Sequence, residues 1–128
     1  NHPAGNIGSK LKMIKDIINH NFPKIVFDKE YINLHLILLE MTKYSIGCCF
    51  FTDKNNEMIG LLTDGDIRRL LLKNTNLKQI NKSNINNIFS FETQLDKLLT
   101  NINNSFKSKF IPILQNCKLF GIIDCRNI

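Results

Sequence analysis

The sequence of 128 residues has no apolar run close to the roughly 18–20 residues that a membrane-spanning helix needs. It also lacks a signal-peptide pattern, and it does not begin with Met. Hydrophobic residues still make up 43% of the chain, which is too many for a disordered protein. We therefore expect a globular, cytoplasmic protein without a membrane partner, and we interpret the chain as a fragment of a longer one.

The sequence also lacks the spacings typical of metal and redox sites. It has four cysteines, but no C-x-x-C motif and no pair of histidines at ligand spacing. Cys48 and Cys49 are adjacent, so on a strand their side chains would point to opposite faces and could not easily share one metal ion. We expect no metal site and no cofactor, and we interpret the cysteines as buried thiols in a reducing compartment.

The net charge of +6 first suggests a nucleic-acid partner. The 14 lysines, however, are spread along the whole chain and accompany 18 asparagines and 19 isoleucines, residues that share AT-rich codons. Dispersed lysines attract phosphate weakly and do not form a groove-reading surface. We therefore expect no nucleic-acid binding.

Apolar spacing in the first half of the chain predicts alternating helices and strands. After a Gly-rich start, a short amphipathic helix extends to about Ile18, and a strand follows at 25–27. A helix over 34–44, closed by Gly47, precedes two strands at 48–52 and 58–63 and a helix over 64–73. The polar, Asn-rich stretch 74–87 is the expected junction to the second half.

The pattern then returns, with a helix predicted over 95–106 and strands at 110–114 and 119–124. Residues 57–63 align with residues 118–124 at an offset of 61 positions. One such unit is too small to bury enough apolar surface alone. We therefore predict an α/β fold in which two units pack through their short β-sheets, with flanking helices.

The sharpest chemical signal is the sequence Gly60-Leu61-Leu62-Thr63-Asp64-Gly65-Asp66, where a buried strand leads into a helix. The helix start offers free backbone N–H groups, to which the Thr63 hydroxyl adds a donor, and this suits a phosphate. The Asp66 carboxylate has the acceptor pair that ribose hydroxyls need. The alternative is structural: Thr63 or Asp64 caps the helix, and Asp66 offsets the helix dipole. Arg69 is a candidate phosphate partner, with a solvated helix face as the simpler interpretation.

This strand-Gly-apolar-apolar-Thr-x-x-Asp pattern, repeated about sixty residues later, resembles a tandem pair of CBS motifs. The resemblance implies a first motif over 13–75 and a second, shorter motif over 76–128, which bind an adenosine or cytidine nucleotide or a nucleotide sugar between them. It implies that Thr63, Asp64, Asp66 and Arg69 are the ligand-binding residues. In the second motif Asp124 and Asn127 stand where Thr and Asp are expected, so we expect that site to be disabled.

The start of the chain, His2-Pro3-Ala4-Gly5-x-x-Gly8-x-Lys10, together with residues 63–69, resembles the C-terminal part of D-arabinose 5-phosphate isomerases. In that family a sugar-isomerase (SIS) domain precedes the CBS pair, so residues 1–12 are the expected linker. The resemblance implies that His2 is catalytic in the parent enzyme, although this fragment alone is not an enzyme. It implies a regulatory module that senses a nucleotide, with a homodimer through CBS pairs and a tetramer in the parent. The alternative is a ligand-free assembly module of the same enzyme.

Overall fold

The computed structural model of the chain describes residues 16–86 and 110–124. The chain divides into two compact units: Asn21–Phe91 forms the first unit, and Asn1–His20 together with Glu92–Ile128 forms the second unit. The predicted boundary between residues 75 and 76 falls inside the first unit. Most of the helix predicted before Ile18, and all of the one predicted over 95–106, lie outside the described residues.

The first unit is built on a three-stranded sheet with the strand order β1-β3-β4. Its members are β1 (Lys24–Val26), β3 (Cys48–Thr52) and β4 (Met58–Thr63). β1 runs parallel to β3, whereas β3 and β4 form an antiparallel hairpin in which Cys48 lies opposite Thr63. All five residues of β3 are buried, as expected for a strand covered on both faces. The hairpin therefore holds Thr63 at the end of a rigid strand.

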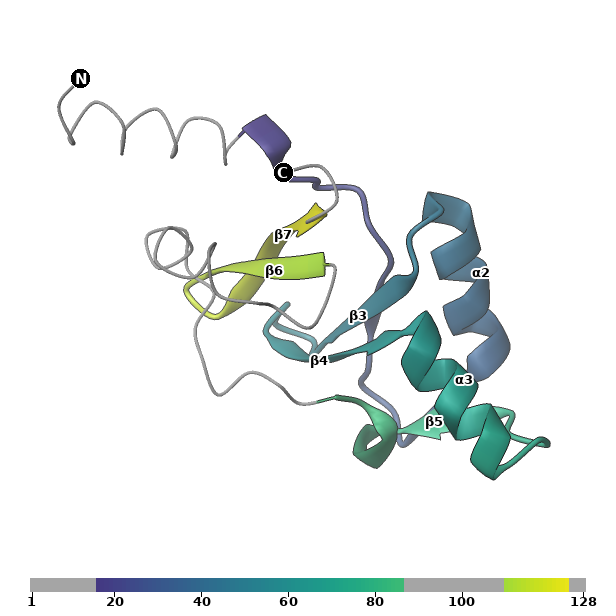
Figure 1. Cartoon of the computed structure of the whole chain (residues 1–128). Helices are drawn as coiled ribbons and strands as arrows, with labels where there is room; N and C mark the ends of the chain where they lie inside the picture. The colour runs from purple at the N-terminus through teal and green to yellow at the C-terminus, as the bar shows by residue number, and fades with distance from the viewer. Residues whose placement is uncertain (1–15, 87–109, 125–128) are drawn as a thin grey trace, which may run out of the picture. The chain divides into compact units, whose positions relative to one another are not determined.

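Two helices, α2 (Leu34–Tyr44) and α3 (Asp64–Lys73), lie on one side of β3 and β4 (Figure 1). The bounds of both helices, and those of β3 and β4, are the predicted ones. α2 begins at a cap that the sequence supplies locally, because the Asn33 side chain accepts a hydrogen bond of 2.8 Å from the backbone N–H of His35.

The prediction that Gly47 closes α2 is wrong. The helix ends instead at Ser45, which has a φ of 54° and donates its backbone N–H to carbonyl groups of the last turn. Gly47 has a negative φ, and a Cβ atom at this position would collide with the Asp64 side chain. Gly47 therefore makes room for the first residue of α3 and does not terminate the helix before it.

The core of the first unit lies between the helices and the sheet. It consists of buried side chains from both helices, from the strands and from the segment that follows them: Phe27, Ile32, Leu34, Ile37, Met41, Cys49, Phe51, Leu62, Ile67, Ile80 and Ile85. Leu34, Ile37 and Met41 share one face of α2 because their spacing matches the helical repeat. This packing fixes α3, and with it the residues at its start, against the sheet.

Two short strands occur where the sequence indicates none. β2 (Tyr31–Asn33) and β5 (Gln79–Asn81) form an antiparallel ribbon in which Ile32 lies opposite Ile80, and the 3-10 helix η1 (Lys82–Asn84) follows. Each strand buries a single side chain, so its three residues show too little alternation to be distinguished from a polar loop. After η1 the chain reaches the edge of β4, where Leu61 and Asn86 exchange two backbone hydrogen bonds.

The described part of the second unit contains the antiparallel hairpin of β6 (Phe110–Gln115) and β7 (Lys118–Asp124). Both strands were predicted. Asn116 and Cys117 form the turn, and both have positive φ values, as a two-residue type I′ turn requires. The beginning of the described chain belongs to this unit as well, because Asn19 pairs with Ile122 as an isolated antiparallel bridge.

The sequence repeat is present in the backbone geometry of the two hairpins. Phe51 lies opposite Gly60 in the first unit, and Ile113 lies opposite Gly121 in the second. In each hairpin the register shifts immediately after that pair, which marks an irregularity at the equivalent place. The repeat is thus structural and extends beyond a similarity of residue types.

The cysteines of the first unit are free and buried. Burial raises the pKa of the Cys48 and Cys49 thiols, which therefore behave as small apolar side chains and not as nucleophiles. Within residues 16–86 and 110–124 no three potential ligands gather as a metal site would require. In the same part of the chain no helix combines the length and the apolar character needed to cross a bilayer.

Candidate functional site

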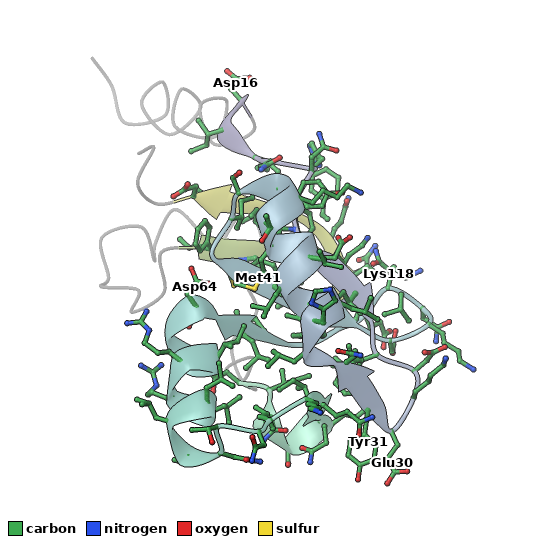
Figure 2. The ribbon with its side chains drawn as sticks, turned by 90° about the vertical axis from the view of Figure 1, so that its right-hand side faces the viewer. Asp16, Glu30, Tyr31, Met41, Asp64 and Lys118 are labelled. Carbon is green, nitrogen blue, oxygen red and sulfur yellow. The ribbon has the colours of Figure 1, made fainter. Side chains whose placement is uncertain are left out.

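The candidate site lies at the junction of β4 and α3, where Thr63 caps the helix. The Thr63 hydroxyl accepts a hydrogen bond of 3.1 Å from the backbone N–H of Asp66, and the Thr63 N–H donates to Oδ2 of Asp66 at 2.9 Å. Together these bonds form a capping box, which satisfies two backbone groups that a helix start otherwise leaves unpaired. Figure 2 shows Asp64 at this end of α3, one residue after the cap.

Asp66 connects the helix start to two other side chains. Arg69 donates from Nη2 to Oδ1 at 2.8 Å, and Asn86 donates from Nδ2 to Oδ2 at 2.6 Å. Burial of the Asp66 carboxyl raises its pKa, but the hydrogen bonds from Thr63, Arg69 and Asn86 outweigh burial and hold the net pKa below its ordinary value. Asp66 is therefore an ionised carboxylate at neutral pH.

A surface groove of about 440 Å³ adjoins Asp66. It is lined by about two turns of α3 and by residues after β5: Asp66, Arg69, Leu70, Leu72, Lys73, Asn84 and Asn86. The Arg69 side chain is 68% exposed, whereas that of Asp66 is only 14% exposed. The groove thus combines two exposed cationic groups, two carboxamides and one carboxylate held by hydrogen bonds, a set that can bind a phosphorylated molecule with hydroxyl groups.

The structure places the predicted residues in three different settings. Thr63, Asp66 and Arg69 lie together, whereas Asp64 is exposed, and its backbone N–H donates to the Gly47 carbonyl at 3.0 Å. His2 and Asn127 lie outside the described residues, and Asp124 is the last residue of β7. The structural alternative is confirmed for Thr63, which caps α3, whereas Asp66, which was expected only to offset the helix dipole, takes part in the capping box. Their roles toward a ligand stay predictions.

Sequence reasoning did not find Asn84, Asn86 and Lys73, which complete the groove. Asn86 approaches Asp66 from 20 positions further along the chain, through the ribbon of β2 and β5 that was not predicted. One signal for Asn86 was present in the sequence. Ile85-Asn86 and Ile18-Asn19 are the same dipeptide, and each pairs with the central residue of a repeated strand, Leu61 or Ile122.

Solved structures with a similar fold are CBS domain pairs. The CBS domain pair of protein MJ0100, in complex with 5′-methylthioadenosine and S-adenosyl-L-methionine, has a TM-score of 0.67 and 16% identity, covering 89% of this chain and 90% of its own. Staphylococcus aureus OpuCA has a TM-score of 0.67 and 18% identity, covering 87% and 91%. CBSX2 in complex with AMP has a TM-score of 0.64 and 13% identity, covering 89% and 90%. The chain has the fold of a CBS domain pair, and the predicted α/β class is confirmed.

Proteins with similar sequences indicate a more specific relationship within the proteins that contain CBS domain pairs. The arabinose 5-phosphate isomerase KdsD of Escherichia coli K12 is 31% identical to the chain over 66% of the chain and 26% of the enzyme. An uncharacterized protein of Rickettsia prowazekii is 31% identical over 99% of the chain and 40% of that protein. No protein-family model matches the chain. The resemblance to arabinose 5-phosphate isomerases is thus confirmed, and the chain spans less than half the length of these relatives.

Proposed function

We propose that the chain is the regulatory CBS-pair module of a D-arabinose 5-phosphate isomerase that senses a nucleotide or a nucleotide sugar. The parent enzyme would interconvert ribulose 5-phosphate and arabinose 5-phosphate in the cytoplasm, for synthesis of the lipopolysaccharide sugar Kdo. Residues 1–12 would link the module to a SIS domain that contains the catalytic machinery, including His2. The similarity to KdsD supports this parent. The ligands bound in the MJ0100 and CBSX2 structures, all of them adenosine derivatives, support the ligand class.

The observation that carries the proposal is the groove beside Asp66. The Asp66 carboxylate is fixed by Thr63 and Asn86, so ordering it for a ligand costs little conformational entropy. Its Oδ1 atom accepts only the bond from Arg69 among the bonds described, and a second lone pair is left for a ribose hydroxyl. Arg69 and Lys73 are one helical turn apart and supply positive charge for a phosphate on the same wall.

A thermal-shift series with AMP, ADP, ATP and the cytidine nucleotides tests this function. A nucleotide at about a hundredfold its dissociation constant should stabilise the fold by about 2.7 kcal/mol. Arg69→Ala should weaken the response, because it removes a phosphate partner from the groove. Arg68→Ala is the matched control, since this neighbouring arginine does not line the groove and its removal should leave the response intact. The proposal fails if no nucleotide shifts the wild-type melting temperature, or if the two variants respond alike.

A second function, assembly of isomerase subunits, is favoured by one observation on α2. Leu36 and Leu39 stand three positions apart on one face of this helix, and about half of each side chain is exposed (54% and 51%). Neighbouring exposed leucines are typical of a surface that a partner covers. Under this alternative the partner is a second copy of the chain, which would give the predicted homodimer and the tetramer of the parent.

Light scattering tests the assembly function. If the face of Leu36 and Leu39 assembles the protein, Leu36→Glu combined with Leu39→Glu should reduce the measured mass to that of a monomer. Thr42→Glu, an exposed position of the same helix, controls for the added charge and should keep the mass of the wild type. A monomeric wild-type chain would exclude this alternative for the fragment.

A further inference from the structure

The two glycines of the sequence repeat have the same kind of neighbour in the two units. In each unit the glycine lies in a strand, and an Ile-Asn dipeptide from elsewhere in the chain packs on it. A Cβ atom on Gly60 would meet the Ile85 side chain and would lie 2.8 Å from the Asn86 carbonyl oxygen. A Cβ atom on Gly121 would meet Ile18 and would lie 3.0 Å from the Asn19 carbonyl oxygen. The close approach explains why both strands carry glycine here.

The backbone bonds of the two dipeptides match as well. Asn86 donates to the Leu61 carbonyl at 3.0 Å and accepts from the Leu61 N–H at 3.2 Å. Asn19 donates to the Ile122 carbonyl at 2.8 Å and accepts from the Ile122 N–H at 2.9 Å. Leu61 and Ile122 each follow the repeated glycine. Ile85-Asn86 and Ile18-Asn19 are therefore equivalent edge elements, one in each unit.

The equivalence has an unusual consequence for the connectivity. Ile85-Asn86 follows the strands that it closes, whereas Ile18-Asn19 precedes the strand it closes by about a hundred positions. His20 strengthens the contact: its Nδ1 atom lies 3.2 Å from the Phe120 carbonyl oxygen, and its ring packs edge-on against the Phe120 ring at 4.9 Å. Figure 1 shows this purple segment beside the yellow end of β7.

We propose that Ile18–His20 is a clasp that completes the second unit by holding the start of the described chain against β7. The segment leads directly into the first unit, yet its backbone bonds and its packing are made with the second. Opening the clasp would therefore loosen β7 and leave the backbone bonds between Leu61 of β4 and Asn86 in place. The proposal does not depend on the identity of the ligand or on the proposed function.

Residue-resolved hydrogen exchange on the intact chain tests the clasp. Asn19→Pro removes the N–H that donates to Ile122, and exchange of the Ile122 amide should rise about tenfold, as expected when a protecting backbone hydrogen bond is lost. The Leu61 amide should stay within about twofold of the wild type, because its partner Asn86 is untouched. Asn86→Pro is the matched variant and should give the reverse pattern.

Two further variants keep the test decisive if the proline substitutions disturb folding. Ile18→Ala removes the side chain that packs on Gly121 but keeps every backbone bond, and it should raise exchange at Ile122 and not at Leu61. Ile85→Ala should again do the opposite. Unchanged protection of Ile122 in Asn19→Pro and Ile18→Ala, or an equal loss at both amides, would overturn the proposal.

Discussion

Replacing Asp66 with Ala should lower the free energy of unfolding by about 2 kcal/mol, because one carboxylate holds three partners. The substitution removes the acceptor of the Thr63 N–H, the ion pair with Arg69 and the bond from Asn86. Most of the cost comes from the capping box, since the Arg69 side chain is largely exposed and its ion pair is screened by solvent. Urea denaturation followed by circular dichroism measures the change.

Two variants separate the contributions of Asp66. Asp66→Asn keeps an acceptor for the Thr63 N–H but loses the charge, so its cost should fall between those of the wild type and Asp66→Ala. Asp64→Ala removes another carboxylate from the same helix turn, one that takes no part in the capping box. Its loss of unfolding free energy should be well under the ~1 kcal/mol of a surface helix-dipole interaction. An equal cost for Asp64→Ala and Asp66→Ala would show that only helix-dipole charge matters.

The stabilisation from Asp66 should also depend on pH. Its pKa in the folded protein lies below the ordinary value, so the folded state favours the ionised form more than the unfolded chain does. The contribution is therefore complete above the unfolded pKa of about 4 and is lost as the pH falls through the folded value. The stability difference between wild type and Asp66→Asn should be constant near neutral pH and shrink below about pH 4. A constant difference down to pH 2 would contradict this assignment.

The sequence predicts those contacts of the site that are made between residues close together in the chain. Thr63 and Asp66 are three positions apart at a strand-to-helix junction, and spacing alone places their side chains within reach of each other's backbone. The hairpin of β3 and β4 and the bounds of α3 were predictable for the same reason. Strong apolar runs with polar residues on either side leave little freedom for the ends of these elements.

The rest depends on contacts between segments that are distant in the sequence. Asn86 reaches Asp66 because the weak strands β2 and β5 bring the chain back to the sheet, and neither strand has a pattern of its own. The end of α2 was predicted, but the residue that closes it was not, because Ser45 adopts the left-handed conformation that glycine usually supplies. The Asp64 side chain occupies the space where a Cβ atom of residue 47 would lie, a contact that only the folded structure reveals.

Asp66 therefore has a structural task and a proposed binding task that use the same carboxylate. The bonds from Thr63 and Asn86 go to Oδ2, whereas Oδ1 bonds only to the exposed Arg69 among the bonds described. A ligand hydroxyl can accordingly approach Oδ1 without opening the capping box, and Arg69 can turn toward a phosphate at little cost. The geometry lets the site bind a ligand while the start of α3 stays intact.

Replacing Gly60 with Ala should destabilise the protein, whereas the same replacement at Gly65 should not. The added methyl group would overlap the Ile85 side chain and press on the Asn86 carbonyl, which is backbone and cannot turn away. We expect a loss of about 3 kcal/mol, at the upper end of the cost of overpacking. Gly65→Ala is the matched control. There the methyl group meets only the flexible end of Arg69, and better helix propensity should stabilise the protein by about 0.5 kcal/mol.

A double-mutant cycle identifies the cause of the loss at Gly60. Ile85→Ala alone should destabilise the first unit by about 2–4 kcal/mol, because it empties a buried position of the core. In the double variant the new methyl group occupies part of that space. The losses of unfolding free energy in the two single variants should therefore sum to about 1–2 kcal/mol more than the loss in the double variant. We assign the part of the Gly60→Ala loss that Ile85→Ala does not relieve to the overlap with the Asn86 carbonyl oxygen. Strict additivity would mean that the Ile85 side chain plays no part in the loss at Gly60, and the packing of Ile85 on this position would then not explain why it is glycine.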